Sequence, residues 1–115
     1  MVSHLVLMKV RADLSPADRM ALTSAFERAI REIPSVRDVR VGRRITHGAS
    51  YELGAPDTAD YLAIVDFDDV SGLQEYLRHP AHEELGTRFN DSLSAAVVYD
   101  FDVGGTEKLK SFVAS

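Results

Sequence analysis

Hydrophobic residues in the first third of the chain form a strand-like run followed by a helix-like repeat. The run HLVLMKVR, residues 4–11, is β-branched or aliphatic over its centre and predicts a first strand. Ser15, Pro16 and Asp18 then suit the N-cap, the first position and the acidic first turn of a helix. Pro34 ends this helix because proline cannot continue it. The apolar positions in between share one helical face: Leu22, Phe26, Ala29, Ile30 and Ile33.

Three further apolar segments complete the set of predicted strands. Residues 36–45, 61–67 and 95–103 are rich in β-branched, aliphatic and aromatic side chains. The loop over residues 46–60 is long for a hairpin, and loops of this kind are often lids or mobile segments. With the helices included, the order is β-α-β-β-α-β. This split βαβ pattern predicts a ferredoxin-like α+β fold with an antiparallel sheet.

The second helix is predicted to break in its middle. Asp68 or Asp69 can cap a short helix. Its apolar stripe consists of Leu73, Tyr76 and Leu77. Pro80 disfavours helical geometry at the preceding residue, so a new helix begins at Pro80 with its own phase. The core-facing stripe of that second piece consists of His82, Leu85, Phe89 and Leu93.

The strands are apolar on both faces, although the helices of this fold cover only one. The third strand, YLAIVDF, has a single charged residue and does not alternate. Strands of this kind need both faces buried. We therefore expect the helix-free face to pack against a second copy, giving a homodimeric α/β barrel. Residues 1–103 form the single domain, and residues 104–115 form a C-terminal tail that is either flexible or docked on the partner subunit.

Composition narrows the class of protein. A chain of 115 residues fits one domain, which buries roughly two-thirds of its unfolded surface. The net charge of -5 argues against nucleic-acid binding, because neutralising phosphates needs an excess of Lys and Arg. The basic stretch RDVRVGRR, residues 37–44, is the exception. It predicts a solvated or interface strand, with an anion site as the alternative.

Cysteine usage and hydropathy exclude several further classes. The sequence has no cysteine, so disulfides, thiolate nucleophiles and Cys-based metal sites are ruled out. No 18-residue apolar run occurs, and the start lacks the basic region of a secretory signal. We expect a cytoplasmic protein with no membrane partner.

The segment YLRHPAH, residues 76–82, concentrates the candidate chemistry. It holds two of the four histidines in the chain, on either side of one proline. Because the helix restarts at the proline, Tyr76 and His82 each fall on a core-facing stripe. Strand alternation also places His4 on one face of the first strand. If that face meets the helices, His4 joins Tyr76 and His82 around one cavity.

Three other residues are candidates for the wall of this pocket. Tyr61 on the third strand and Phe26 on the first helix could line the cavity. His79 directly precedes a proline at a helix junction, where a residue often acts as a cap instead.

A neutral imidazole beside a phenol makes chemical sense as an acid–base pair. Histidine titrates near neutrality and can take a proton, while a tyrosine hydroxyl can polarise a carbonyl oxygen. The alternative is that His82 is simply a hydrogen-bonded core residue. His79 and His82 also have an H-x-x-H spacing, but the intervening proline spoils the geometry of a helical metal pair. We expect neither a metal nor an organic cofactor.

Four segments resemble the stress-responsive A/B barrel (Dabb) family over residues 3–103. They are HLVLMKV, IPSVRDVRVGR, YLRHPAH and VVYDFDV. The resemblance implies the same fold and a tight homodimer. A plant polyketide cyclase of this family uses a His and a Tyr that match His82 and Tyr76, and the histidine of its first strand matches His4. Tyr61 and Phe26 replace a pocket histidine and a pocket tyrosine of that enzyme.

The resemblance implies acid–base chemistry on a small aromatic or polyketide-like carbonyl compound. Two alternatives remain open: a non-enzymatic stress-associated dimer or ligand-binding module, and a cofactor-independent monooxygenase of the antibiotic monooxygenase type. Some plant members bind magnesium, but no ligand set maps onto this chain.

Overall fold

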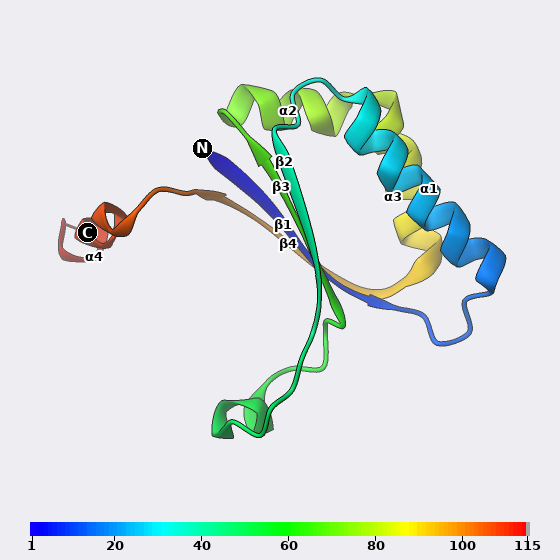
Figure 1. Cartoon of the computed structure of the whole chain (residues 1–115), viewed down its shortest axis with the longest axis horizontal. Coiled ribbons are helices and arrows are strands. Elements are labelled where there is room, and N and C mark those ends of the chain that lie inside the picture. Colours follow the sequence, from blue (N-terminus) through cyan, green and yellow to red (C-terminus); the bar gives the residue numbers. More distant parts are fainter. Residues whose placement is uncertain (115) are drawn as a thin grey trace.

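A computed structural model of the chain describes residues 1–114 and places a layer of helices against one sheet (Figure 1). The main elements follow the predicted order: β1 (Val2–Val10), α1 (Pro16–Glu32), β2 (Asp38–Arg43), β3 (Tyr61–Phe67), α2 (Val70–Arg78), α3 (Pro80–Ser92) and β4 (Leu93–Asp102). Three short helical segments lie outside this frame: η1 (Ser50–Gly54), η2 (Thr106–Leu109) and α4 (Lys110–Ala114). None of the helices within residues 1–114 is both long and apolar enough to cross a membrane.

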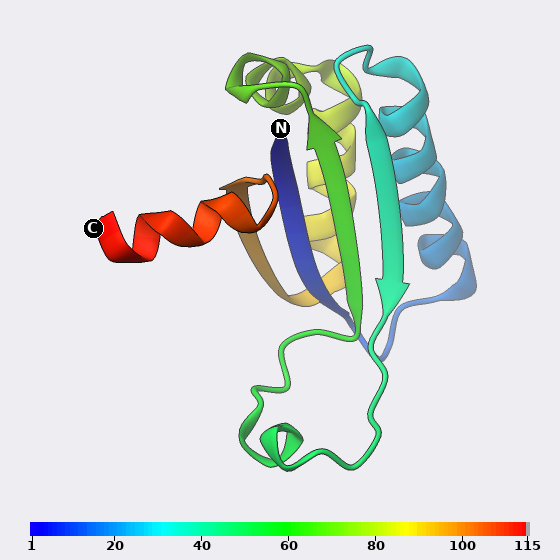
Figure 2. The ribbon, with the colours of Figure 1, turned by 60° about the vertical axis from the view of Figure 1, so that its left-hand side comes forward.

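The sheet has the strand order β2-β3-β1-β4, and every neighbouring pair is antiparallel. This is the ferredoxin-like arrangement that the sequence predicts. All three main helices lie on the same side of the sheet, and Figure 2 shows the opposite, helix-free face. In β1, Val6 lies opposite Ala63 of β3 and Val98 of β4, so these three side chains share the helix-facing side.

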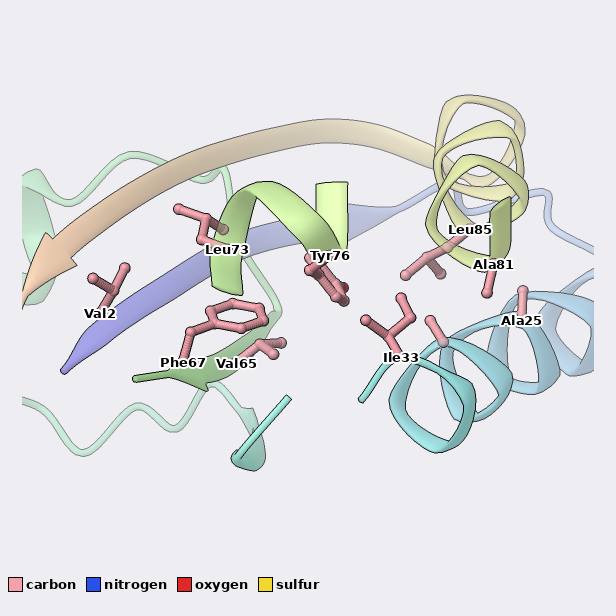
Figure 3. Packing of buried hydrophobic residues seen from close by; sticks show 10 residues of the cluster. Val2, Ala25, Ile33, Val65, Phe67, Leu73, Tyr76, Ala81 and Leu85 are labelled. Atoms are coloured by element: carbon pink, nitrogen blue, oxygen red, sulfur yellow. The ribbon is translucent and has the colours of Figure 1, made fainter. Parts of the chain in front are cut away.

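The core lies between the sheet and the helices. The strands contribute Val2, Val6, Met8, Ala63, Val65 and Phe67, all of which are buried. Ala25 and Ala29 of α1 and Ala81 of α3 are buried too, and their small side chains allow the two helices to approach each other closely. Figure 3 shows Tyr76 of α2 between β3 residues Phe67 and Val65 on one side and Ile33 on the other.

The helix boundaries are set by the expected caps. Ser15 Oγ accepts the Asp18 N–H at 3.1 Å, and Asp69 Oδ1 accepts the Gly72 N–H at 2.9 Å. One stripe assignment was wrong. Leu77 is exposed, because it lies about 100° around α2 from Tyr76 while Leu73 and Tyr76 face the core.

Strand boundaries differ from the sequence prediction by a few residues. β1 begins two positions earlier than expected, at Val2. β2 is shorter because the chain is still in a turn at Val36, where the amide donates to the Ile33 carbonyl. Leu93 ends the apolar stripe of α3 in the prediction but is the first residue of β4 in the structure. The residues at which each strand begins and ends depend on its pairing with the neighbouring strand, and the local sequence does not reveal that pairing.

The helix-free face is mostly apolar. Its side chains include Leu5, Leu7, Leu62, Ile64, Val97, Tyr99 and Phe101, as the strand registers show. Tyr99 and Phe101 are 56% and 50% exposed. Polar contacts interrupt the face at Asp66, whose Oδ1 accepts from Ser3 Oγ at 2.5 Å and whose Oδ2 lies 3.7 Å from Arg40 Nη2.

Two segments project from the sheet away from the helix layer. Both the 46–60 loop with η1 and the C-terminal segment with η2 and α4 extend outward in Figures 1 and 2. The C-terminal segment is helical and is anchored by Lys108 Nζ, which lies 2.6 Å from Asp102 Oδ2. Ser115, the last residue of the predicted tail, lies outside the described residues.

Candidate functional site

Three of the predicted site residues form one ring cluster. The centroids of Tyr76 and His82 are 4.7 Å apart, and those of His4 and Tyr76 are 5.8 Å apart in an edge-on arrangement. Phe67 packs against the same tyrosine at 5.2 Å. The cluster joins the last turn of α2, the first turn of α3 and the start of β1.

The break between α2 and α3 explains how Tyr76 and His82 meet. His79 has φ -69° and ψ 140°, an extended conformation that ends α2. Pro80 then begins α3 in a new direction. In one continuous helix, residues six positions apart would point to different faces.

Tyr76 is enclosed and carries a hydrogen-bond donor. Its side chain is 2% exposed, and burial raises its pKa to about 12. The phenol is therefore protonated at neutral pH. Burial is the sole cause that acts on this pKa, and no hydrogen bond of the hydroxyl is seen within residues 1–114.

His82 is half-buried, and its pKa is shifted in the direction opposite to that of Tyr76. Loss of solvent is the main cause that lowers its pKa, and the nearby His4 acts in the same direction. A backbone hydrogen bond at Leu77 and the carboxylate of Glu83 oppose this shift. The imidazole is therefore neutral at pH 7 and can accept a proton.

Asp100 is a member of the cluster that the sequence reasoning missed. His4 Nδ1 lies 2.6 Å from Asp100 Oδ1, because the two residues face each other across β1 and β4. An ionised carboxylate can only accept, so Nδ1 carries the hydrogen and Nε2 is left for other contacts. The split βαβ order makes these strands neighbours, which is the signal that could have identified Asp100.

Phe26 and Tyr61 lie in a separate place from the ring cluster. They line an apolar cavity of about 510 Å³ between the sheet and α1, together with Met8, Ile30 and Phe89. The lining does not include His4, Tyr76 or His82. The predicted site residues thus form two groups between the sheet and the helices: the ring cluster of His4, Tyr76 and His82, and the cavity lined by Phe26 and Tyr61. His82 and Phe89 lie about 10 Å apart along α3, at roughly 1.5 Å per residue.

His79 caps α3. Its Nδ1 accepts the Ala81 N–H at 3.0 Å, and its side chain does not line the apolar cavity. Within residues 1–114, no three His, Asp or Glu side chains gather in a way that could hold a metal ion.

Comparisons with known proteins agree with this architecture. The family model of the stress responsive A/B barrel domain matches residues 2–103. Olivetolic acid cyclase from Cannabis sativa is 22% identical over 100 residues, which cover 87% of this chain and 94% of that protein.

Two solved structures show the same fold. Hydroxynitrile lyase from Passiflora edulis superposes with a TM-score of 0.73 at 16% identity, covering 91% of this chain and 94% of the lyase. A dimeric ferredoxin-like protein of unknown function from Thermobifida fusca superposes with a TM-score of 0.69 at 19% identity, covering 89% and 90% of the two chains. The match of the family model over nearly the whole domain decides the family. This chain belongs to the stress responsive A/B barrel domain family.

Proposed function

We propose that the chain is a homodimeric protein whose subunits bind a small aromatic or polyketide-like carbonyl compound and act on it by acid–base chemistry. The observation that carries this proposal is the buried contact between Tyr76 and His82, with His4 held by Asp100 beside them. Similarity to a cyclase and to a lyase supports the same class of chemistry.

The two central residues have complementary roles. His82, neutral at pH 7, takes a proton from the carbon next to a carbonyl group, and the electron pair of that C–H bond moves to the carbonyl oxygen. The Tyr76 hydroxyl donates a hydrogen bond to this oxygen as negative charge develops on it. The carbanion then attacks a second carbonyl of the same molecule, and His82 returns the proton to the new alkoxide.

His4 and Asp100 act as positioning residues. The 2.6 Å contact fixes the orientation of the His4 ring, which lies edge-on to Tyr76. The apolar body of the ligand occupies the cavity lined by Phe26 and Tyr61. Its volume of about 510 Å³ is within the usual range for small-molecule sites.

A second candidate is a ligand-binding dimer without catalysis. The observation that favours it is the enclosure of the cluster, since Tyr76 and His4 are 2% and 5% exposed and Tyr76 packs in the hydrophobic core. A core role alone would account for such burial.

The test uses two simple probe reactions that need a general base. One is the exchange of the α-hydrogens of acetophenone, a ketone, for deuterium in D₂O. The other is the cleavage of mandelonitrile, a cyanohydrin, to benzaldehyde and hydrogen cyanide. General acid–base catalysis contributes about 10²–10⁴-fold, so we expect His82→Gln to lose at least about 100-fold of the acceleration. Tyr76→Phe should lose a similar factor while remaining folded. Tyr51→Phe, in the exposed loop, is the matched control.

Full activity of His82→Gln on either probe would show that His82 takes no part in the chemistry.

Ligand binding is followed separately by NMR with ¹³C-methyl-labelled methionine. Met8 lines the apolar cavity, while Met1 and Met20 are exposed and serve as internal references. A shift of the Met8 signal alone, with no turnover of either probe, favours the ligand-binding candidate.

A further inference from the structure

A second cavity adjoins the apolar one at the end of the sheet near the 46–60 loop. Its volume is about 630 Å³. The two cavities share Val10, Arg19 and Tyr61 in their linings, so they are direct neighbours. The second cavity is polar, because its wall contains four arginines and two aspartates.

Two elements change from apolar to cationic at this boundary. Along β2, Val41 lines the apolar cavity, and Arg43 follows on the same face of the strand, opposite Tyr61. Along α1, Arg19 precedes Leu22 and Phe26 at helical spacing. The charged ends of these elements gather at one mouth.

The arginines at this mouth are not all neutralised. Arg11 is engaged by Asp13, with Nη2 and Oδ2 3.0 Å apart. Within residues 1–114, the guanidinium group of Arg19 donates to a backbone carbonyl, that of Leu14, and forms no ion pair. The guanidinium groups of Arg43 and Arg44 form no hydrogen bond with any residue in the described part of the chain, although the charge of Arg44 acts on the carboxylate of Asp57 and helps to lower its pKa.

The nearby carboxylates do not balance these charges. Asp57 is held by Lys9, with Nζ and Oδ2 2.6 Å apart. That leaves Asp60 at the mouth and Glu27 at the edge of the apolar cavity, against the three guanidinium groups of Arg19, Arg43 and Arg44. A local excess of positive charge is notable in a chain whose net charge is -5.

We infer that the ligand is an amphipathic anion, with its apolar body in the 510 Å³ cavity and its carboxylate or phosphate head at Arg19, Arg43 and Arg44. Guanidinium groups match the oxygen geometry of both heads. The inference rests on the proposed function only in placing the ligand in the apolar cavity, and it is independent of whether His82 performs catalysis.

The test compares octanoate, octyl phosphate and 1-octanol by titration calorimetry, together with the Met8 methyl signal. We expect both anions to bind more tightly than the alcohol and to shift Met8 while Met1 and Met20 stay in place. In Arg43→Gln/Arg44→Gln the anions should lose at least about tenfold in affinity, since a charge-assisted hydrogen bond contributes about 1.5–3 kcal/mol. Binding of 1-octanol should be unchanged.

The control is Arg31→Gln, which removes the same charge at the far end of α1, roughly 18 Å from Arg19 along the helix axis. It should leave the affinities for all three probes unchanged.

The relative affinities of octanoate and octyl phosphate show whether the site prefers a carboxylate or a phosphate head. Equal binding of octanol and the anions, or anion binding that survives the double substitution, overturns the anionic head but leaves the apolar cavity as a ligand site. No binding of any probe overturns the cavity as well, while the acetophenone assay still tests His82.

Discussion

The phenol of Tyr76 and the imidazole of His82 both lose water on folding, and this one cause keeps both neutral. Burial raises the pKa of the acid to about 12 and lowers the pKa of the base. A neutral donor therefore lies beside a neutral acceptor over a wide range of pH. Perturbed groups of this kind gather at functional sites, although core packing can perturb a pKa as well.

The lowered pKa of His82 predicts a specific pH dependence of stability. The unfolded chain binds a proton at this position near the ordinary histidine pKa of about 6.5, whereas the folded chain resists it until lower pH. The free energy of unfolding therefore falls as the pH drops through about 6.5 and levels off below the folded pKa. We expect the parent protein to lose more stability between about pH 7.5 and pH 5 than His82→Gln does.

Thermal unfolding followed by circular dichroism across this range measures the effect. His47 and His79 are present in both proteins, so their contributions cancel in the difference, which reports His82 together with its coupling to His4. Both proteins are compared at one concentration, because association changes the apparent midpoint. Parallel pH profiles of the two proteins would show that folding does not perturb His82.

Sequence reasoning at this scale identified Tyr76, His82 and His4 but not their partner. The proline between the two helical pieces carries enough information to place Tyr76 and His82 on inward faces. Asp100 lacks any local signal, because its role depends on lying opposite His4 in the neighbouring strand. Cross-strand partners require the register, which the sequence of one strand does not contain.

At the scale of elements, the junction at His79 and Pro80 gives α2 and α3 independent phases. His79 supplies the N-cap of α3, accepting the Ala81 N–H at 3.0 Å. Loss of a side-chain cap costs about 0.5–2 kcal/mol, so we expect His79→Ala to lower the free energy of unfolding by about 1 kcal/mol. His79→Ser should retain most of it, since serine is a favoured cap.

Urea unfolding of the three proteins measures this difference, with acetophenone exchange as the second readout. A cap role predicts that activity follows stability and returns in His79→Ser. If His79→Ser remains stable but loses activity, the imidazole itself is needed, and His79 belongs to the ligand site.

The same scale shows why one cavity was predicted where the structure separates the candidate residues into two groups. The sequence indicates which residues face the layer between sheet and helices, and both groups of candidates do. Their division into a ring cluster and an apolar cavity depends on how closely each helix approaches the sheet. The position of Arg43 at the polar cavity could not be predicted from the sequence either. It follows from the end of β2 at this residue and from the pairing of Arg43 with Tyr61.

At the scale of the whole molecule, the two faces of the sheet differ. The helices bury one, and the other presents a broad apolar surface that includes Tyr99 and Phe101. An exposed apolar patch of this kind usually marks an interface. The Thermobifida fusca protein of the same fold is dimeric, and a homodimer is part of the function proposed for this chain. The 46–60 loop and the C-terminal segment extend beyond the sheet and frame the surface.

The proposed homodimer predicts that one charge on this face separates the subunits. Tyr99 lies opposite Leu5, is 56% exposed, and would be buried by a second sheet. Burying an unpaired carboxylate costs several kcal/mol, and every 1.4 kcal/mol weakens association about tenfold. We expect the parent protein to sediment as a dimer at micromolar concentration and Tyr99→Glu to sediment as a folded monomer. Met20→Glu, on the exposed side of α1, should remain dimeric. A monomeric parent, or a Tyr99→Glu variant that stays dimeric, would rule out association through this face.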